Sequence, residues 1–432
     1  MKNGKTMLLV GLASSLALAG CSGGKETAAT PDGGAPAKQE PVTIRIYLWD
    51  PVNEDLFQSV FAEPVRKKYP HITLEPITRG KDTQPETLAV GGSGADIIMA
   101  WNSVLPQFTN LKLLSDITPK LKTEQIDLNR FDPLIVDGLR DNDNKSILYG
   151  LPFGVDFYAT FYNKDIFDKF GVPYPKDGMY WEDAIELAKK LTRTEAGVQY
   201  KGLDPEGIEK LGNPLSLQFV DPKTSKASVN TDQWKKVFEL AKTIYAIPGN
   251  ENTISNHAGT VARFVKDKNV AMYPSHGVLG GLAQSDLNWD VVQYPSYRER
   301  PNAYGMVQAY ALCITTNSAN PDQALKVIQV LTSDDVQMAY TKKAAVLSPL
   351  KNPELHKYFG ADMPILKGKN VEGILKSKPA PFAAQSVYSG NVRVVLEKKF
   401  AEYMKGKDLN TALREAEEEG NKGIEASKGA AK

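Results

Sequence analysis

Aromatic and polar side chains occur together at the ends of several β-rich segments of the sequence. These residues are Trp49 and Asp50, then Trp101, Asn102 and Ser103, and later Ser275 and His276. Ligands of open α/β sheets bind beyond the carboxyl ends of the strands, so these positions are candidates for a binding site. An indole ring can cover the C–H face of a sugar, while carboxylates, amides and hydroxyls can pair with its hydroxyl groups. The pattern therefore favours a carbohydrate ligand.

Signatures of other chemistries are weak. Residues 91–94, GGSG, lack the Gly-Lys-Ser/Thr ending of a phosphate-binding loop. Residues 141–152 begin like a calcium loop, but a lysine, a serine and a proline stand where an oxygen ligand, the glycine and the terminal glutamate are needed. The sequence has no Gly-x-Ser-x-Gly elbow and no His-Glu-x-x-His pair, and its four histidines leave little for a metal centre. We expect no catalytic residue, no metal and no cofactor.

The elements around these residues alternate between strand and helix. Residues 42–48 read as a strand, residues 56–61 repeat apolar side chains at helical spacing, and residues 71–75 and 96–100 read as further strands. This order predicts a parallel sheet covered by helices on both faces. Further helices are expected over 181–191, 234–245 and 321–331, and short strands over 270–273 and 290–294. The fold class is therefore α/β.

The length of 432 residues exceeds what one ordinary core accommodates, because cores stop growing at about 250–300 residues. We therefore expect two lobes. The formal net charge of +1 gives no basic excess, which argues against nucleic acid as a partner. Two cysteines cannot form a disulfide framework, and Cys313, inside an apolar run, is expected to be a buried, inert thiol.

The first twenty residues have the pattern of a signal peptide. Lys2 and Lys5 precede an apolar stretch over 7–18, which is too short to span a membrane comfortably. The stretch ends in Leu-Ala-Gly-Cys at 18–21 and resembles a bacterial lipobox, so Cys21 is expected to carry the lipid. An ordinary secretory signal in which Cys21 is incidental is the alternative. Residues 21–41 form the lipidated cysteine and a linker with no aromatic and no large aliphatic residue, which should stay solvated.

Four stretches resemble the large extracellular solute-binding proteins of ABC importers, the group that includes maltose-binding protein. They are KKYPHITLE at 67–75, GGSGADII at 91–98, the series YGLPF, FYNKDIF and WEDA at 149–153, 161–167 and 181–184, and VAMY at 270–273 followed by Gly277. Ala95 stands where the family usually has proline, and Tyr180 where it often has a capping serine or threonine. The likeness covers most of 42–345.

The resemblance implies two discontinuous α/β lobes joined by a hinge of crossing strands, as in type II periplasmic binding proteins. Lobe one is expected over 42–154 plus 274–304, and lobe two over 155–273 plus 305–432, with crossings at 155–161 and 307–314. The first crossing adds Asp156 and Tyr158 to the candidate site, and Tyr304 precedes the second crossing. In maltose-binding relatives, an acid occupies the position that Asp156 matches, and aromatic residues cluster near the position of Tyr388.

Together these features predict a lipid-anchored receptor on the extracytoplasmic face of the cell membrane. As a monomer, it would bind a carbohydrate, with an oligosaccharide favoured, and deliver it to the membrane subunits of an ABC permease. One alternative is an anchored, secreted carbohydrate-active enzyme, which in the retaining class needs two carboxylates about 5–5.5 Å apart. Another is a receptor for a non-sugar solute such as a polyamine or a peptide.

Overall fold

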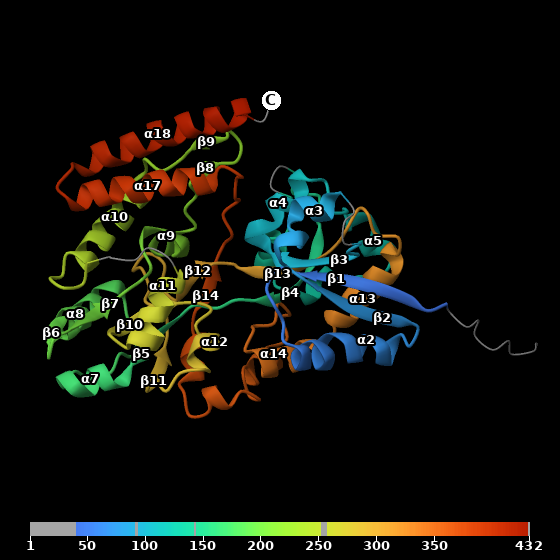
Figure 1. The fold of residues 1–432 in the computed structure, drawn as a ribbon, viewed down its shortest axis with the longest axis horizontal. Coiled ribbons are helices and arrows are strands. Elements are labelled where there is room, and N and C mark those ends of the chain that lie inside the picture. Colours follow the sequence, from blue (N-terminus) through green and yellow to red (C-terminus); the bar gives the residue numbers. More distant parts are fainter. Residues whose placement is uncertain (1–39, 91–93, 142–143, 252–256, 431–432) are drawn as a thin grey trace, which may run out of the picture. The chain divides into compact units, whose positions relative to one another are not determined.

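The computed structural model describes residues 40–90, 94–141, 144–251 and 257–430 (Figure 1). The expected signal peptide, the linker up to residue 39 and the lipidation site at Cys21 lie outside the described residues. Within these residues the chain forms two five-stranded sheets. Each sheet has its own apolar core, which confirms the expected two-lobed α/β fold.

The first sheet has the strand order β2-β1-β3-β13-β4. Its strands are β1 (Val42–Leu48), β2 (Ile72–Thr78), β3 (Ile97–Trp101), β4 (Gly150–Val155) and β13 (Ala309–Ile314). β1 runs parallel to β2 and β3, as the β-α-β order predicts, whereas β13 runs antiparallel to both β3 and β4. The parallel strands all end on one edge of the sheet, where the candidate residues after β1 and β3 lie.

Helices pack around this first sheet. Those of the first lobe are α1 (Glu54–Leu56), α2 (Glu63–Lys68), α3 (Pro85–Ala89), α4 (Leu105–Asn110), α5 (Thr118–Thr123), α6 (Pro133–Asp137), α13 (Pro321–Leu331), α14 (Asp334–Ala344) and α15 (Pro353–Lys357). A π-helical segment over Phe57–Ala62 joins α1 to α2, and Phe57, Val60, Phe61 and Val65 bury the face predicted from their spacing. Cys313 is fully buried in this core, as expected, and burial raises the pKa of its thiol.

The second sheet has the order β11-β5-β10-β7-β6. Its strands are β5 (Ala159–Asn163), β6 (Arg193–Glu195), β7 (Val198–Leu203), β10 (Val270–Ser275) and β11 (Trp289–Val292). β10 is parallel to β7 and antiparallel to β5. Two further pairs lie outside the large sheets, namely β12 (Ala303–Met306) with β14 (Lys378–Ala380), and β8 (Val220–Asp221) with β9 (Lys226–Ala227).

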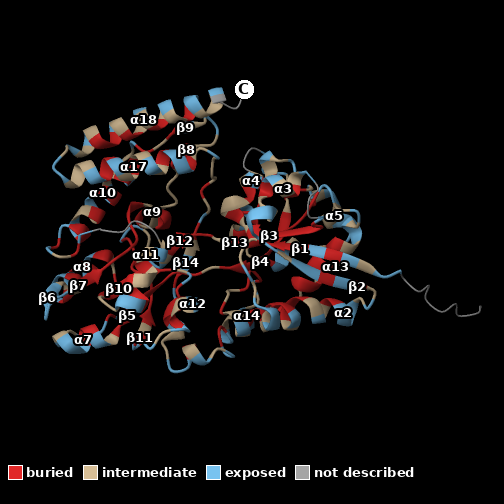
Figure 2. Cartoon of the chain, in the orientation of Figure 1, coloured by how far each residue is buried: buried red, intermediate tan, exposed pale blue. Residues whose placement is uncertain are grey.

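The helices of the second lobe pack on this sheet and on one another. They are α7 (Lys164–Phe170), α8 (Trp181–Leu191), α9 (Ile208–Gly212), α10 (Asp232–Tyr245), α11 (His257–Ala262), α12 (Leu279–Leu282), α16 (Val371–Leu375), α17 (Ser389–Met404) and α18 (Leu409–Ala430). Figure 2 shows buried residues concentrated in the strands and on the inner faces of these helices. Trp181 and Trp234 fill this core, and at the start of α8 the Asp183 side chain accepts a hydrogen bond from the Tyr180 backbone.

The division of the C-terminal half between the lobes differs from the sequence expectation. Residues 274–304 were expected in lobe one, but β11 pairs with β5 of the second sheet. Residues 305–432 were expected in lobe two, but β13 completes the first sheet, and α13 and α14 bury their apolar faces in the first core. The chain returns to the second core after α15, which adds a third passage between the lobes. Strand pairing decides which lobe each segment joins, and the residues of a strand do not by themselves predict which strand it pairs with.

Backbone and side-chain hydrogen bonds join the passages between the two sheets. The passage from β4 to β5 is residues 156–158, and the passage from β12 to β13 is residues 307–308. The Asp156 backbone N–H donates to the carbonyl of Gln308, and Val155 exchanges backbone hydrogen bonds with Leu347. These segments lie inside the crossings expected from the sequence, and they bring Asp156 and Gln308 side by side.

Candidate functional site

A cleft of about 540 Å³ opens where the ends of the two sheets meet the crossings. Its walls include six of the predicted site residues, namely Asp50, Trp101, Ser103, Asp156, Tyr158 and His276. The first three come from the ends of β1 and β3, and the others from the first crossing and the end of β10. The volume lies within the range of about 300–1,000 Å³ that is typical of small-molecule sites.

On the first wall, Asp50 holds two aromatic side chains in place. Its Oδ2 atom accepts hydrogen bonds from Trp101 Nε1 at 2.6 Å and from the Tyr310 hydroxyl at 2.7 Å. The rings of Trp101 and Tyr310 stack with centroids 3.5 Å apart and an interplanar angle of 24°. The buried Tyr310 covers one face of the indole, and Trp101 itself is partly exposed and lines the cleft. The result is a rigid aromatic surface with fixed orientation.

Asn102 and Ser103 connect the first wall to the second crossing. The Asn102 amide donates to the carbonyl of Val307 at 3.1 Å, and its oxygen accepts from the Ala309 backbone N–H at 3.1 Å. Because the side chain is buried and makes these bonds, we assign it a structural role at the hinge. Ser103 does line the cleft, and its hydroxyl donates to Gln308 Oε1 at 3.0 Å.

On the opposite side of the cleft, the second wall, Asp156, His276 and Lys210 form a polar chain. His276 Nδ1 lies 2.8 Å from Asp156 Oδ2, and its Nε2 lies 3.1 Å from Lys210 Nζ. Since a carboxylate can only accept, Nδ1 donates to Asp156 and Nε2 accepts from the lysine. Burial lowers the pKa of Lys210, but Tyr158 and nearby carboxylates raise it more, so the net pKa lies above its ordinary value. The lysine is therefore a cation at neutral pH.

Tyr158 supports this wall through its ring. It packs against His276 with centroids 4.7 Å apart and stacks on Tyr304 at 5.8 Å. Burial raises the pKa of the Tyr158 hydroxyl, so it stays protonated. A Cβ atom at Gly305 would come within 2.7 Å of the Tyr158 ring, so this packing requires glycine at position 305.

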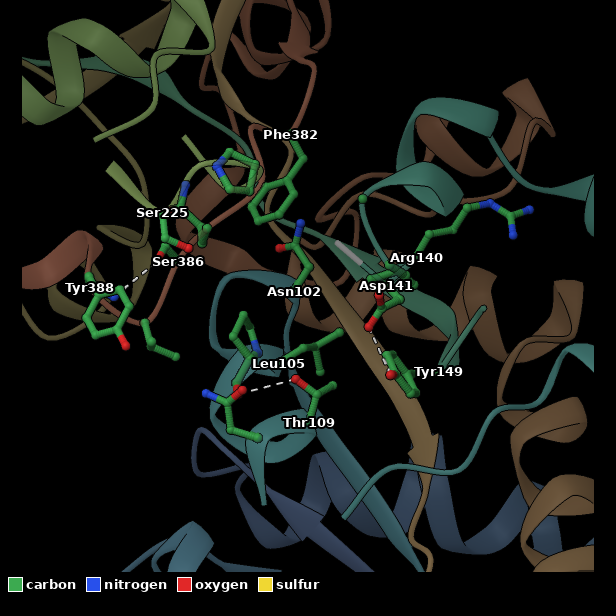
Figure 3. Close-up of a pocket in the computed structure, with 17 residues that line it drawn as sticks. Asn102, Leu105, Thr109, Arg140, Asp141, Tyr149, Ser225, Phe382, Ser386 and Tyr388 are labelled. Atoms are coloured by element: carbon green, nitrogen blue, oxygen red, sulfur yellow. Dashed lines mark hydrogen bonds between the residues drawn. The ribbon is translucent and has the colours of Figure 1, made fainter. Parts of the chain in front are cut away.

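Besides Asn102, four predicted site residues lie away from the cleft walls. Tyr304 is fully buried beneath Tyr158, and Ser275 is buried with its hydroxyl on Glu206 Oε1 at 2.6 Å. Trp49 packs edge-to-face on Phe108, and the Arg79 guanidinium carbon lies 3.8 Å from the centroid of its ring. Tyr388 lines a smaller, neighbouring cavity of about 190 Å³ (Figure 3).

This smaller cavity lies between the first lobe and the segment before α17. Figure 3 shows Phe382, Ser386 and Tyr388 on one side of it, and Asn102, Leu105 and Thr109 on the other. Gln385 lines both this cavity and the cleft. The two spaces therefore share a wall residue, and Tyr388 stays near, rather than in, the main cleft.

Several cleft residues were missed by the sequence reasoning. They are Glu209, Lys210, Asn213, Phe219, Gly277, Met306, Gln308 and Gln385. Gln308 lies in the expected second crossing and Gly277 directly follows His276, so position alone could have indicated them. Lys210 and Asn213 come from the short helical segment after β7, where no strand end or motif marks them.

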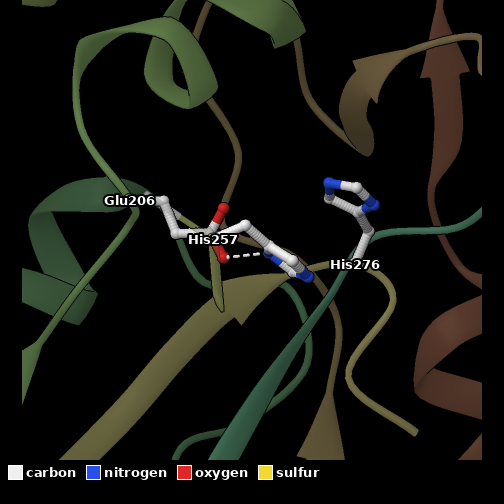
Figure 4. Close-up of side chains that lie close together, drawn as sticks. All are labelled: Glu206, His257 and His276. Atoms are coloured by element: carbon white, nitrogen blue, oxygen red, sulfur yellow. Dashed lines mark hydrogen bonds and ion pairs between the residues drawn. The ribbon is translucent and has the colours of Figure 1, made fainter. Parts of the chain in front are cut away.

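Behind the second wall, Glu206, His257 and His276 lie close together (Figure 4). Glu206 Oε1 is 2.8 Å from His257 Nδ1, and the imidazole rings of His257 and His276 stack with their centroids 5.1 Å apart. Burial raises the pKa of Glu206, but hydrogen bonds from His257 and Ser275 and the charge of Lys210 lower it more, so its net pKa is below the ordinary value. Glu206 is therefore an ionised carboxylate at neutral pH.

Comparison with known proteins places this architecture among binding proteins. Residues 50–338 match the family model described as bacterial extracellular solute-binding protein. A sugar transporter structure from Rhizobium etli, in an open conformation, is 23% identical with a TM-score of 0.70, over 89% of this chain and 99% of that one. The sugar-binding protein MalE from Xanthomonas citri is 19% identical with a TM-score of 0.68, over 90% and 98%.

A third similar structure is an ABC substrate-binding protein from Listeria monocytogenes in complex with cycloalternan. It is 17% identical with a TM-score of 0.70, over 89% of this chain and 99% of that chain. At these identities the structural matches show a common fold. Among the described residues, no helix is both long enough and apolar enough to cross a bilayer.

Proposed function

The chain belongs to the family of bacterial extracellular solute-binding proteins, and we propose that it is a receptor for a carbohydrate, with an oligosaccharide favoured. In this proposal the sugar binds in the cleft and is delivered to an ABC permease. Cys21 holds the receptor, as a monomer, on the extracytoplasmic face of the membrane. Family membership supports the transport role, and the cleft supports the choice of ligand.

The observation that carries the choice of a carbohydrate is the aromatic surface of Trp101 beside polar groups. The indole is fixed by Tyr310 and Asp50, so little side-chain entropy is lost when a sugar ring stacks on it. Ser103, Gln308 and Asp156 offer donors and acceptors around the same space. A pyranose, with apolar faces and a rim of hydroxyls, is complementary to this arrangement.

Two further observations favour an oligosaccharide over a monosaccharide. The cleft has a volume of about 540 Å³, and Gln385 joins its wall to that of the smaller cavity lined by Tyr388. A chain of sugar rings could extend from the Trp101 surface toward that aromatic side chain. The Listeria protein of the same fold is in complex with cycloalternan.

The experiment that tests this proposal is a thermal-shift screen of the purified protein, confirmed by calorimetric titration. The panel should hold monosaccharides, linear and cyclic oligosaccharides, polyamines and peptides. A ligand at a hundred times its Kd stabilises the native state by about 2.7 kcal/mol, which is readily measured. We expect oligosaccharides to raise Tm most. A shift with polyamines or peptides alone would contradict the choice of a carbohydrate.

The same screen separates a receptor from an anchored carbohydrate-active enzyme. Each sugar that raises Tm should be incubated with the protein and then analysed by chromatography. A receptor returns the sugar intact after prolonged incubation. Shorter products that form in proportion to protein concentration would favour the enzyme and contradict the receptor.

A further inference from the structure

Three side chains that can bind a metal, one glutamate and two histidines, converge behind the second wall of the cleft. Glu206 follows β7, His257 begins α11, and His276 follows β10, so three separate segments supply them. One potential ligand atom of each lies within 4.8 Å of the other two. Figure 4 shows the two imidazoles side by side, with the Glu206 carboxylate next to His257.

The carboxylate has an oxygen available to bind. Glu206 is 7% exposed, and hydrogen bonds from His257 and Ser275 reach its Oε1 atom. Its Oε2 atom is fully buried and has no hydrogen-bond partner among the described residues. A buried carboxylate oxygen without a donor is costly, because it has lost its hydration without compensation. A bound cation would supply the missing interaction.

One of the two histidines, His276, has the supporting hydrogen bond that metal ligands usually have. His257 Nδ1 lies 2.8 Å from Glu206 Oε1, and His276 Nδ1 lies 2.8 Å from Asp156 Oδ2. Imidazoles that bind a metal commonly donate their other N–H to a carboxylate, which fixes the tautomer and the ring orientation. His276 can therefore offer Nε2 to an ion, whereas His257 already directs Nδ1 at the Glu206 carboxylate and can offer that nitrogen in exchange for the hydrogen bond.

We propose that Glu206, His257 and His276 bind a divalent transition metal ion of the zinc class. Two imidazoles and one carboxylate suit zinc, nickel or copper, whereas calcium and magnesium prefer sets of oxygen ligands. Three protein ligands leave a fourth position for water or for a donor of a bound solute. Because His276 also lines the cleft, the ion lies at the edge of the ligand site. The inference concerns the metal alone and does not rest on the identity of the sugar.

The Lys210 ammonium occupies the space next to His276 Nε2 that the ion would need. It lies 3.1 Å from His276 Nε2, so it must move before the metal can bind that nitrogen. In a tetrahedral zinc site with bonds of about 2.0–2.1 Å, ligand atoms lie about 3.3 Å apart, so the three side chains must also draw together slightly. The His257 side chain is 40% exposed and has room to rotate. Removing Lys210 should therefore favour the metal.

The test is a calorimetric titration of chelator-treated protein with zinc chloride, repeated with cobalt(II) followed by visible absorption. His257→Ala and Glu206→Gln should each weaken zinc binding by about tenfold or more. Lys210→Met should strengthen it several-fold, because it removes a competing cation. Cobalt should give the intense bands of a four-coordinate site in wild type and lose them in His257→Ala.

His71→Ala and His356→Ala are the matched controls, because the other two histidines of the chain lie outside the cluster. Both should bind zinc like wild type, and Cys21 and Cys313 are present in every variant. Equal zinc affinity in wild type and His257→Ala would overturn the proposal, as would no zinc binding by wild type. Circular dichroism of each variant identifies any loss of zinc binding that is caused by misfolding. Lys210→Met gives an independent test, because unchanged or weaker zinc binding by this variant would also contradict the proposal.

Discussion

At the scale of the residue, Trp101 and Trp49 show how neighbours decide what a side chain can do. Trp49 follows β1 and Trp101 is the last residue of β3, at the edge of the first sheet expected to bind ligand. Trp101 stacks on Tyr310 and faces the cleft, whereas Trp49 is covered by Arg79 and packs against Phe108. The two tryptophans therefore form a matched pair for mutation.

The first prediction is that Trp101→Ala weakens sugar binding by about 1–3 kcal/mol, from the loss of stacking and of buried apolar area. Without ligand, it should cost less stability than the about 3–5 kcal/mol expected for a tryptophan in a core. Calorimetry and thermal melts measure the two effects. Trp49→Ala is the control and should keep sugar affinity. Equal losses of affinity in both variants would contradict the placement of the site on Trp101.

The second prediction concerns Asp156, which accepts from His276 on the cleft wall. Asp156→Asn keeps the size of the side chain but replaces one acceptor oxygen with a donor. Charge-assisted hydrogen bonds are stronger than neutral ones, so sugar affinity should fall while Tm without ligand changes little. Titration of the folded variant with unchanged affinity would place the sugar away from the first crossing.

The sequence indicated these residues more reliably than it indicated their roles. Asp50, Trp101 and Ser103, predicted from strand ends, line the cleft, because parallel strands end at a common edge. Trp49, Asn102 and Ser275, predicted by the same rule, lie away from the cleft walls, since the direction of a side chain at the end of a strand depends on what packs over it. Lys210 could not be predicted as a cleft residue from the sequence, because only the tertiary fold brings its helix to the cleft.

At the scale of the element, the loop before α8 is tied to distant parts of the second lobe by Asp177. Its carboxylate accepts from the Gln293 backbone N–H at 2.8 Å, from Lys376 at 2.6 Å and from Asn370 at 3.2 Å. Burial raises the pKa of Asp177, but these donors and the lysine charge lower it more, so the net pKa is below the ordinary value.

The third prediction follows from this lowered pKa. A carboxyl with a folded-state pKa below its unfolded value stabilises the protein at pH values above the unfolded pKa, near 3.9, and loses that effect as pH falls through the folded pKa. Asp177→Asn should therefore lower Tm at pH 7, and its difference from wild type should shrink below about pH 4. The exposed Asp362→Asn is the control. A difference that stays constant from pH 7 to pH 3 would contradict the assigned role.

Strand pairing is the element-scale feature that the sequence could not supply. The β-rich runs of β1, β2, β3 and β10 were visible in advance, and so were the apolar faces of α8, α10 and α13. The antiparallel insertion of β13 between β3 and β4 was not, since a buried apolar strand fits many neighbours. This insertion changes which lobe receives residues 309–357.

At the scale of the whole molecule, the fourth prediction is closure. Three passages join the lobes, and the cleft walls come from both of them, so a ligand that contacts both walls favours a closed state. Small-angle scattering should show a smaller radius of gyration with saturating sugar than without it. An unchanged radius at saturation would show that binding needs no rotation of the lobes.

The fifth prediction concerns the anchor. The leader and the Leu-Ala-Gly-Cys sequence at 18–21 predict that Cys21 is acylated. Cys21→Ser should abolish incorporation of a labelled fatty acid and release the protein from membranes or stall its processing. Cys313→Ser is the control, because that thiol is buried in the folded protein, and it should keep the label. Label retained by Cys21→Ser would show that the cysteine is incidental.

The central claim is that the cleft between the two sheets holds a carbohydrate, and a crystal structure of the complex tests it most directly. The sugar should be the one that gives the largest thermal shift. We predict density for a pyranose ring against the face of Trp101 opposite Tyr310, with sugar hydroxyls within hydrogen-bond distance of Asp156 or Gln308. A sugar bound elsewhere on the protein, with the Trp101 face unoccupied at full ligand occupancy, would contradict the account.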